Sequence, residues 1–271
     1  MQFIEANGAR IPLIGLGTFE LAGRDCARLV EQAIALGYRH IDTAQMYGNE
    51  REVGEGVRAS GRRNEVVVVT KVAPTNLAPR DFERSVKESL AQLRLSEVDI
   101  LLIHWPNKAV PLADMIGALC AMKRAGYTRH IGVSNFTAAL LDEATRLATE
   151  PLVCNQFETH PFLDTSKTIR ATRSHGMAVV AYSPIARGGA KGNEVLEAIG
   201  KAHGKSAAQV SLRWLVQQGI AAIPRTRRVE RLSENIAVFD FELSEEEMAR
   251  IASLTKTNSR IIDWQYSPQW D

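Results

Sequence analysis

The sequence predicts an α/β protein folded as a single (β/α)8 TIM barrel, and three observations lead to this prediction. Short apolar runs rich in β-branched residues recur eight times along the chain. Each run is followed by a polar bend and a longer segment with helical spacing, as in parallel strands joined by helices. No linker rich in Pro, Gly or Ser divides residues 1–271, and an open sheet would need fewer strands or a second lobe. We therefore expect one domain.

The expected elements begin with a hairpin over residues 3–11, because Asn7-Gly8 lies between two apolar arms. Eight barrel strands follow, and they are expected at residues 13–16, 38–41, 66–70, 98–103, 130–134, 152–154, 178–181 and 220–223. The clearest strand is 66–70, where apolar residues occupy both faces, as a parallel strand covered on both sides requires.

Helices are expected between the strands and at the C-terminal end of the chain. One spans residues 81–94, with apolar residues on one face at Phe82, Val86, Leu90 and Leu93. Another begins at Ser206, which forms a capping-box pattern with Gln209 and precedes a run that Gly219 ends. A further capped helix starts at residues 244–247. The aromatic-containing tail 255–271 could then close over one mouth of the barrel.

Composition and charge argue against nucleic acids and membranes as the main partners. Lys and Arg number 33 against 31 Asp and Glu, a net charge of +2, which gives no general reason to bind nucleic acid or an anionic membrane. No stretch of about 18 apolar residues is present. Residues 1–5 lack the basic-then-apolar layout of a secretion signal, so we expect a cytoplasmic protein.

The cysteines and most of the histidines are expected to be structural or surface residues. Cys26, Cys120 and Cys154 are too few and too far apart for a disulfide framework or a zinc site. Five histidines show no metal-ligand spacing and are expected to have no functional role: His40, His130, His160, His175 and His203. We therefore expect no metal site.

Polar or aromatic residues follow nearly every predicted strand. They are Thr18, Asp42, Lys71, His104, Ser134, Asn135, Gln156, Tyr182 and Arg225. Each one alone is explained by the polar turns that commonly end strands. The carboxyl ends of barrel strands meet at one face, however, and catalytic groups lie there in such barrels. The set as a whole therefore predicts a reactive site at that mouth.

The chemistry of this set indicates reduction of a carbonyl group. Asp42, Lys71 and His104 follow three consecutive strands, and Tyr47 lies in the loop after Asp42. A buried Lys71 needs the Asp42 carboxylate as its partner. The ammonium should in turn lower the pKa of Tyr47 from about 10 and make it a proton donor to a developing alkoxide. His104 can bond the same oxygen if its other ring nitrogen is paired. Hydride must come from a nicotinamide or flavin cofactor.

At this point the sequence resembles the aldo-keto reductases. Residues 37–44, continuing through Tyr47 to residues 50–54, are similar to the first signature of that family. Lys71 after the valine run, His104 within Ile103-His104-Trp105-Pro106, and residues 131–136 are similar to further motifs of the family. The resemblance extends over essentially the whole chain. It is strongest to the prokaryotic 2,5-diketogluconate and methylglyoxal reductases.

This resemblance implies an NADPH-dependent enzyme that reduces small aldehydes, α-ketoaldehydes or diketo sugar acids to alcohols. It implies Asp42, Tyr47, Lys71 and His104 as catalytic residues, with Tyr47 as general acid. His104 stands where steroid double-bond reductases of the family carry Glu, which implies carbonyl reduction here. Tyr47, His104 and Trp105 would form the substrate pocket. We expect no partner besides the small carbonyl substrate, and a monomer.

The resemblance also implies a cofactor site without a Rossmann fold. Its residues would be Gly17, Thr18, Asp42, Ser134, Asn135, Gln156, Tyr182, Ser183, Pro184, Ile185, Arg187, Gly188, Ile223, Arg225, Thr226, Arg227, Arg228, Arg231, Glu234 and Asn235. Ser134, Asn135 and Gln156 would hold the carboxamide, and Tyr182 would stack on the nicotinamide. Residues 223–231 resemble the 2′-phosphate clamp of the family, which usually opens Lys-Ser. Arg225-Thr226 departs from that pattern, but Arg is a good phosphate ligand.

Other interpretations of these residues remain open at this stage. Gly15-Leu16-Gly17 resembles the start of a dinucleotide fingerprint, but Glu20 stands where the third glycine belongs. The arginines of 225–231 could form a solvated helix start or a nucleic-acid patch. The protein could bind a nicotinamide and regulate with little turnover. It could instead be a barrel isomerase or aldolase that uses Lys71 as a Schiff-base amine.

Overall fold

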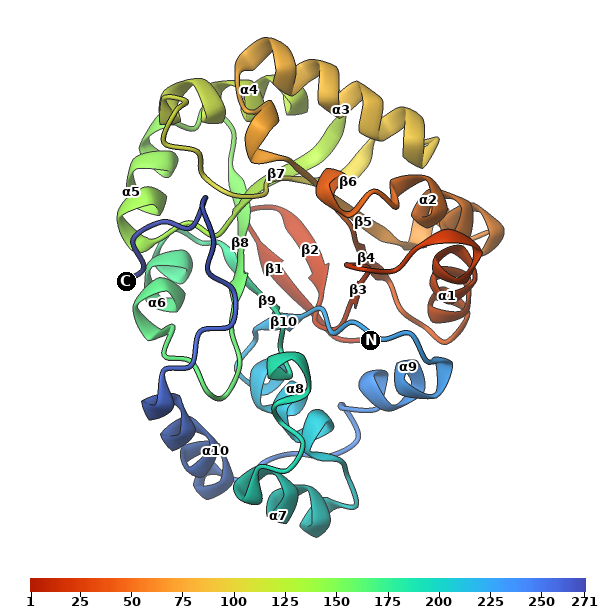
Figure 1. The fold of residues 1–271 in the computed structure, drawn as a ribbon, viewed down its shortest axis with the longest axis vertical. Helices are drawn as coiled ribbons and strands as arrows, with labels where there is room; N and C mark the ends of the chain where they lie inside the picture. Colours follow the sequence, from red (N-terminus) through yellow and green to blue (C-terminus); the bar gives the residue numbers. More distant parts are fainter.

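A computed structural model describes residues 1–271, and its parallel strands form a ring surrounded by helices (Figure 1). The eight-stranded sheet has the order β10-β9-β8-β7-β6-β5-β4-β3, and every neighbouring pair is parallel. The ring closes where Ile14 bridges Ala222. There the Gly15 N–H donates to the Ala222 carbonyl at 2.9 Å, and the Ala222 N–H donates to the Leu13 carbonyl at 2.8 Å. The predicted (β/α)8 barrel is therefore confirmed.

The strands are β1 Phe3–Ala6, β2 Ala9–Pro12, β3 Leu16–Gly17, β4 His40–Asp42, β5 Val67–Val72, β6 Val98–Ile103, β7 Thr128–Ser134, β8 Leu152–Glu158, β9 Ala178–Tyr182 and β10 Ala221–Ala222. The α-helices are α1 Gly23–Ala35, α2 Glu50–Ala59, α3 Pro79–Leu93, α4 Leu112–Arg124, α5 Ala138–Leu147, α6 Ser166–Ser174, α7 Glu194–His203, α8 Ala207–Gln217, α9 Val229–Ile236 and α10 Glu245–Ala252. Short 3-10 helices span Gln45–Tyr47, Arg63–Glu65, Pro74–Asn76, Ala186–Gly188 and Ser253–Thr257. No helix is long and apolar enough to cross a bilayer.

Strand boundaries differ most from expectation at β8. The prediction ended this strand at residue 154, because the next residues are polar, but pairing with β9 continues to Glu158. Asn155, Gln156 and Glu158 are nevertheless buried, and each makes side-chain hydrogen bonds inside the protein. A buried polar residue with its partners in place is compatible with a strand interior, and the apolar pattern alone does not detect it.

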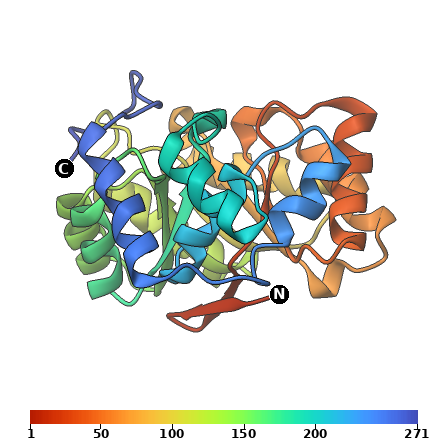
Figure 2. The same ribbon diagram turned by 90° about the horizontal axis from the view of Figure 1, so that it is seen from below.

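The N-terminal hairpin covers one end of the barrel, and the C-terminal tail lies at the other (Figure 2). Strands β1 and β2 pair antiparallel around Asn7 and Gly8, whose φ values of 46° and 86° are those of a tight two-residue turn. The Asn7 side-chain amide donates to the carbonyls of Leu152 and His175 at 2.7 and 3.1 Å. These bonds fix the hairpin across the amino ends of the strands.

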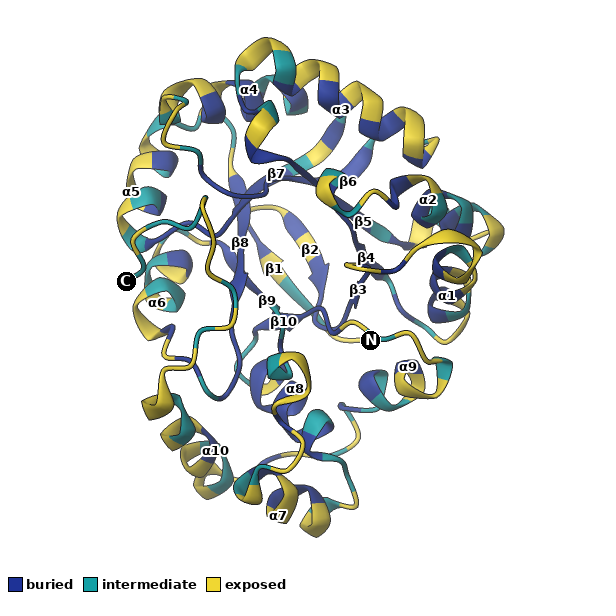
Figure 3. Ribbon diagram, in the orientation of Figure 1, coloured by how far each residue is buried: buried dark blue, intermediate teal, exposed yellow.

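The helices bury their inner faces on the barrel and expose their outer faces (Figure 3). Helices α8 and α10 each begin with the predicted capping box, at Ser206 and Ser244. The three cysteines are buried and unpaired, as predicted. Burial raises the pKa of the Cys26 and Cys154 thiols to about 12, with smaller contributions from Glu52 and Asp42 respectively, so neither is a reactive thiolate at neutral pH.

Close packing of α2 against the end of α3 depends on Gly54. A methyl group at Gly54 would overlap the Leu93 carbonyl, whereas one at Gly117, on the exposed face of α4, would meet nothing within 4 Å. We expect Gly54→Ala to lower the free energy of unfolding by about 1–3 kcal/mol because backbone must move. Gly117→Ala should raise it by up to about 1 kcal/mol through helix propensity. Urea unfolding of both variants tests this, and equal effects would contradict it.

Candidate active site

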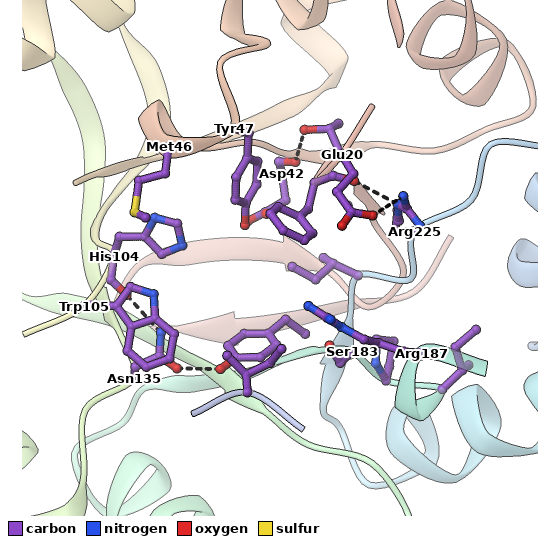
Figure 4. Close-up of a pocket in the computed structure, with 18 of the residues that line it drawn as sticks. Glu20, Asp42, Met46, Tyr47, His104, Trp105, Asn135, Ser183, Arg187 and Arg225 are labelled. Carbon is purple, nitrogen blue, oxygen red and sulfur yellow. Dashed lines mark hydrogen bonds and ion pairs between the residues drawn. The ribbon is translucent and has the colours of Figure 1, made fainter. Parts of the chain in front are cut away.

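A cavity of about 660 Å³ opens at the carboxyl ends of the strands (Figure 4). It is lined by Gly17, Thr18, Phe19, Glu20, Asp42, Met46, Tyr47, His104, Trp105, Asn135, Tyr182, Ser183, Pro184, Ile185, Arg187, Gly188, Ile223, Arg225, Ile262 and Trp264. His104, Trp105 and Met46 lie at one end of the cavity, and Arg187 and Arg225 lie at the other. The cavity thus has an aromatic end and a cationic end.

A buried ion pair lies beneath the aromatic end. The Lys71 ammonium donates to Asp42 Oδ1 at 2.6 Å, to the Thr43 carbonyl at 2.8 Å and to the Tyr47 hydroxyl at 3.3 Å. The second carboxylate oxygen, Asp42 Oδ2, accepts from Gln156 Nε2 at 2.8 Å. Both side chains are withdrawn from solvent, with exposures of 0% and 1%. Complete hydrogen bonding is what makes such a buried pair tolerable.

Burial and this ion pair together determine the protonation of the site. Burial lowers the pKa of Lys71, but the Asp42 carboxylate and the Tyr47 hydroxyl outweigh burial, so the pKa lies above its usual value. Burial raises the pKa of Tyr47, and the Lys71 ammonium only partly opposes that shift. The expectation that Lys71 lowers the pKa of Tyr47 below its ordinary value is therefore wrong, because desolvation is the larger effect. Tyr47 is a protonated phenol at neutral pH.

Tyr47 is held over this pair by the short helix that follows β4. Its ring makes edge contacts with the rings of Phe19 and His104, at centroid distances of 5.1 and 5.6 Å. Gly48 ends the turn in the left-handed region, with φ 64°. Asp42, Tyr47, Lys71 and His104, which lie in or after three different strands, therefore meet at one point.

His104 is a neutral imidazole in this structure. Burial, and secondarily the Lys71 ammonium, lower its pKa well below the usual value. Its Nδ1 is buried without a hydrogen-bond partner, so the expected pairing of the second ring nitrogen is not found. A buried unpaired N–H is rarer than an unpaired acceptor, which favours the tautomer with the proton on Nε2. In that tautomer His104 is a hydrogen-bond donor through Nε2.

The predicted carboxamide residues divide into two groups. Asn135 and Tyr182 line the cavity, and the Tyr182 hydroxyl donates to Asn135 Oδ1 at 2.8 Å. Ser134 and Gln156 lie behind the lining: the Ser134 hydroxyl donates to the Gln156 carbonyl at 2.8 Å, and the Gln156 amide bonds Asp42. Gln156 is thus placed to orient the Asp42 carboxylate rather than to contact a ligand directly.

At the cationic end, Arg225 is already paired with an acidic side chain. Its guanidinium bonds the Glu20 carboxylate, and its Nε donates to the Phe19 carbonyl at 2.8 Å. Arg227 donates to the Glu20 carbonyl at 3.3 Å, and Arg187 lies over the Phe19 ring at 5.9 Å. Loop 19–20 is thereby tied to the segment after β10. The sequence offers no signal for a role of Glu20, because its partner lies some 200 positions away along the chain.

Other residues of the predicted phosphate clamp lie outside the cavity. Thr226, Arg227, Arg228, Arg231, Glu234 and Asn235 are not among the lining residues. Thr226 and Arg227 precede α9, Arg228 is its N-cap, and the other three lie within the helix, where Arg231 pairs with Glu234 one turn later. Five lining residues were not predicted as site residues: Phe19, Glu20, Met46, Ile262 and Trp264. The last two belong to the tail, which the sequence indicated could close over a mouth, and they form part of the wall of the open cavity.

Comparison with known proteins identifies the family. The profile of the Aldo/keto reductase family matches residues 13–256. Methylglyoxal reductase DkgB of Salmonella typhi is 37% identical over 265 residues, covering 96% of this chain and 99% of that protein. Glyoxal reductase of Bacillus subtilis (strain 168) is 39% identical over 252 residues, covering 92% and 91%. A crystal structure provisionally assigned as a 2,5-diketo-D-gluconic acid reductase B is 46% identical, with a TM-score of 0.98 and coverage of 100% and 98%.

The chain belongs to the aldo-keto reductase family, and the resemblance seen in its sequence is confirmed. It is an oxidoreductase of the class that acts on carbonyl compounds, and the family in general uses nicotinamide cofactors.

The buried ion pair gives a test on stability. Asp42→Asn leaves the Lys71 charge buried without its counter-charge, and we expect it to lower the free energy of unfolding by about 3–5 kcal/mol. The double variant Asp42→Asn with Lys71→Met should lose less than the sum of the two single changes, because it removes both charges. Chemical unfolding of the four proteins measures this coupling, and strictly additive losses would contradict it.

Proposed function

We propose that this protein is an NADPH-dependent carbonyl reductase in which Tyr47 is the general acid. The observation that carries the proposal is the meeting of the Tyr47 hydroxyl with Lys71 Nζ at 3.3 Å, beside His104 and at the wall of an open cavity. Burial keeps the phenol protonated, and the adjacent ammonium stabilises the phenolate that remains after the proton has left. Negative charge forms on the tyrosine oxygen only as the proton leaves, so the Lys71 ammonium would stabilise the transition state more than the ground state.

The cavity residues fit a nicotinamide dinucleotide by their chemistry. Tyr182 offers an aromatic face and Asn135 an amide at the catalytic end, while Arg187 and Arg225 offer cations for phosphate at the other. At Gly17 a methyl group would come within 2.8 Å of the Ile223 carbonyl oxygen, so the wall of the groove there is backbone. When bound, the nicotinamide would supply the hydride that no side chain can provide.

The chain's own residues would orient the carbonyl and deliver the proton. His104, neutral and with its proton on Nε2, would donate a hydrogen bond to the substrate oxygen. Tyr47 would transfer its proton to the same oxygen as negative charge develops there. Asp42 keeps Lys71 charged, and Gln156 keeps Asp42 oriented. Trp105 would shield the reacting carbon from water on the side of the tail.

The substrate class we propose is small aldehydes and dicarbonyl compounds. Two relatives are named methylglyoxal reductase and glyoxal reductase, and a close structural neighbour is assigned to a diketo sugar acid. The cavity is apolar around the catalytic tyrosine, where Met46, Trp105 and Trp264 form its walls. We therefore choose the reduction of methylglyoxal as the first assay. The expectations of a single domain and a monomer stay predictions.

Lys71 is poorly suited to form a Schiff base. A nucleophilic amine must lose its proton, whereas the pKa of Lys71 is raised and its ammonium bonds three oxygen atoms. A regulatory protein with little turnover would need no general acid, yet Tyr47 and His104 both face the cavity. Catalytic reduction is accordingly favoured over both alternatives.

Replacement of the proposed acid tests the mechanism. We expect Tyr47→Phe to lower kcat for methylglyoxal reduction by about 10²–10⁴-fold, because the proton donor is lost. NADPH binding, followed by protein fluorescence, should change little. Tyr127→Phe, at the opposite end of β6 and β7, is the control and should keep full activity. If Tyr47→Phe reduces the substrate at the parent rate, the acid is another group.

Cofactor preference tests the role of Arg225. Arg225→Ala should weaken NADPH binding by about tenfold or more and NADH binding much less, since only NADPH carries the 2′-phosphate. Glu20→Gln should tighten NADPH binding, because the phosphate then no longer competes with an internal carboxylate for Arg225. Arg80→Ala, exposed at the start of α3, is the control. Equal losses for both cofactors in Arg225→Ala would rule out a phosphate clamp at this residue.

A further inference from the structure

A second pair of buried ionisable groups lies at the same mouth of the barrel, outside the catalytic cluster. Glu158 ends β8 and His160 follows two residues later, and both side chains are 0% exposed. His160 Nδ1 accepts a hydrogen bond from the Phe162 N–H at 3.2 Å. The ring therefore carries its proton on Nε2 and donates it to Glu158 Oε1 at 3.0 Å. His160, expected from the sequence to be structural, orients this carboxylate.

The carboxylate of Glu158 also accepts hydrogen bonds from the C-terminal tail. The backbone N–H groups of Ile261 and Ile262 donate to Oε1 and Oε2, each at 2.7 Å. Glu158 makes no ion pair with a lysine or arginine, so its hydrogen bonds are a histidine N–H and two consecutive tail amides. Hydrogen bonds to a buried carboxylate are stronger than neutral ones, and losing them is costly. A carboxylate in this position is therefore a specific anchor for residues 261 and 262.

The anchored residues lead directly into the cavity wall. Ile262 and Trp264 are lining residues, and the Trp264 ring packs edge-on against Trp105 at 5.6 Å. Trp105 in turn stacks beside His104 at 6.5 Å. Figure 1 shows the tail passing in front of β8 on its way to the C-terminus. The position of the wall formed by Ile262 and Trp264 thus depends on where the tail is held.

Other contacts of the tail flank this anchor, and the Trp270 ring also packs edge-on against Trp105 at 6.1 Å. Upstream, the Ser259 N–H donates to the Phe162 carbonyl at 2.7 Å. Downstream, the Asp271 side chain accepts from the Ala138 N–H at 2.8 Å and pairs with Lys167 at 3.2 Å. Between these two attachments, the tail backbone is hydrogen-bonded to the barrel through Glu158, at residues 261 and 262. Without Glu158, Ile262 would lose its hydrogen bond to the barrel and Trp264 would keep its ring packing against Trp105, while both ends of the tail remain attached.

We propose that Glu158, oriented by His160, is a positioning residue that fixes Ile262 and Trp264 and thereby sets how large a carbonyl substrate the cavity accepts. This inference rests on the proposed function for its catalytic consequence. The anchoring itself stands on the hydrogen bonds and is measured independently of catalysis.

The test is Glu158→Gln, with Glu247→Gln as the matched control. Glu247 also bonds a histidine, His203 at 2.9 Å, and a backbone amide, that of Ser244 at 2.8 Å, but it is in α10 away from the cavity. Glutamine keeps the size of the side chain but loses its charge and one acceptor oxygen. Both variants lose a charge that a histidine and backbone amide groups bond, and only Glu158→Gln loses the tail anchor. Glu158 is the more buried of the two, with side-chain exposures of 0% for Glu158 and 17% for Glu247.

Limited trypsin digestion measures the anchoring. Trypsin would cleave the peptide bond between Arg260 and Ile261, and the N–H of this peptide bond donates to Glu158. We expect Glu158→Gln to increase the rate of cleavage at this bond by about tenfold. Glu247→Gln should cleave there at the parent rate. Equal rates in Glu158→Gln and the parent protein would overturn the proposal, whether or not the enzyme reduces carbonyls.

Kinetics with two substrates measures the catalytic consequence. For Glu158→Gln we expect the ratio of KM for phenylglyoxal to KM for methylglyoxal to change at least about threefold, with kcat for methylglyoxal nearly kept. A purely structural role would change activity with both substrates in parallel, and that result would overturn the specificity role. If Glu158→Gln does not fold, Trp264→Ala must show the same change in ratio, and an unchanged ratio overturns the proposal. Absence of any carbonyl reduction by the parent protein would instead refute the proposed function, and digestion would still decide the anchoring.

Discussion

The ion pair between Asp42 and Lys71 is the interaction on which the rest of the site depends. It lies where two neighbouring barrel strands end, at a depth where neither charge could exist alone. Tyr47 above it and Gln156 beside it take their positions from its hydrogen bonds. The barrel therefore holds the Lys71 ammonium next to the Tyr47 phenol, and burial keeps water from weakening the electrostatic interaction between them.

The two ends of the cavity use charge in opposite ways. At the aromatic end the charges are buried, paired with each other and directed at one hydroxyl. At the other end Glu20 and Arg225 are partly exposed and pair with each other across segments that are distant in the chain. An exposed pair contributes little to stability and can be exchanged for a ligand at small cost. The first arrangement suits chemistry, and the second suits reversible binding.

The sequence predicted the barrel, the hairpin, the capped helices and the meeting of Asp42, Tyr47, Lys71 and His104, because strand order and residue type determine these features. It predicted the wrong direction for the Tyr47 pKa shift, because that direction depends on whether desolvation or the nearby ammonium is the larger effect. It also missed the pairing of Glu20 with Arg225 and the anchoring of the tail by Glu158. Those contacts join segments whose separation along the chain leaves no periodic pattern.

Strand β8 serves three parts of the molecule at once. The Asn155 amide donates to the Phe136 carbonyl before α5, Gln156 bonds Asp42, and Glu158 holds the tail. A shift of register lies between β7 and β8 near Ile131 and Val133, and beyond it Ser134 pairs with Gln156. Because side chains alternate across a strand, inserting or deleting one residue before Asn155 would turn each of these three side chains to the opposite face of the sheet. A change in the length of β8 would consequently disturb the cavity, the ion pair and the tail together.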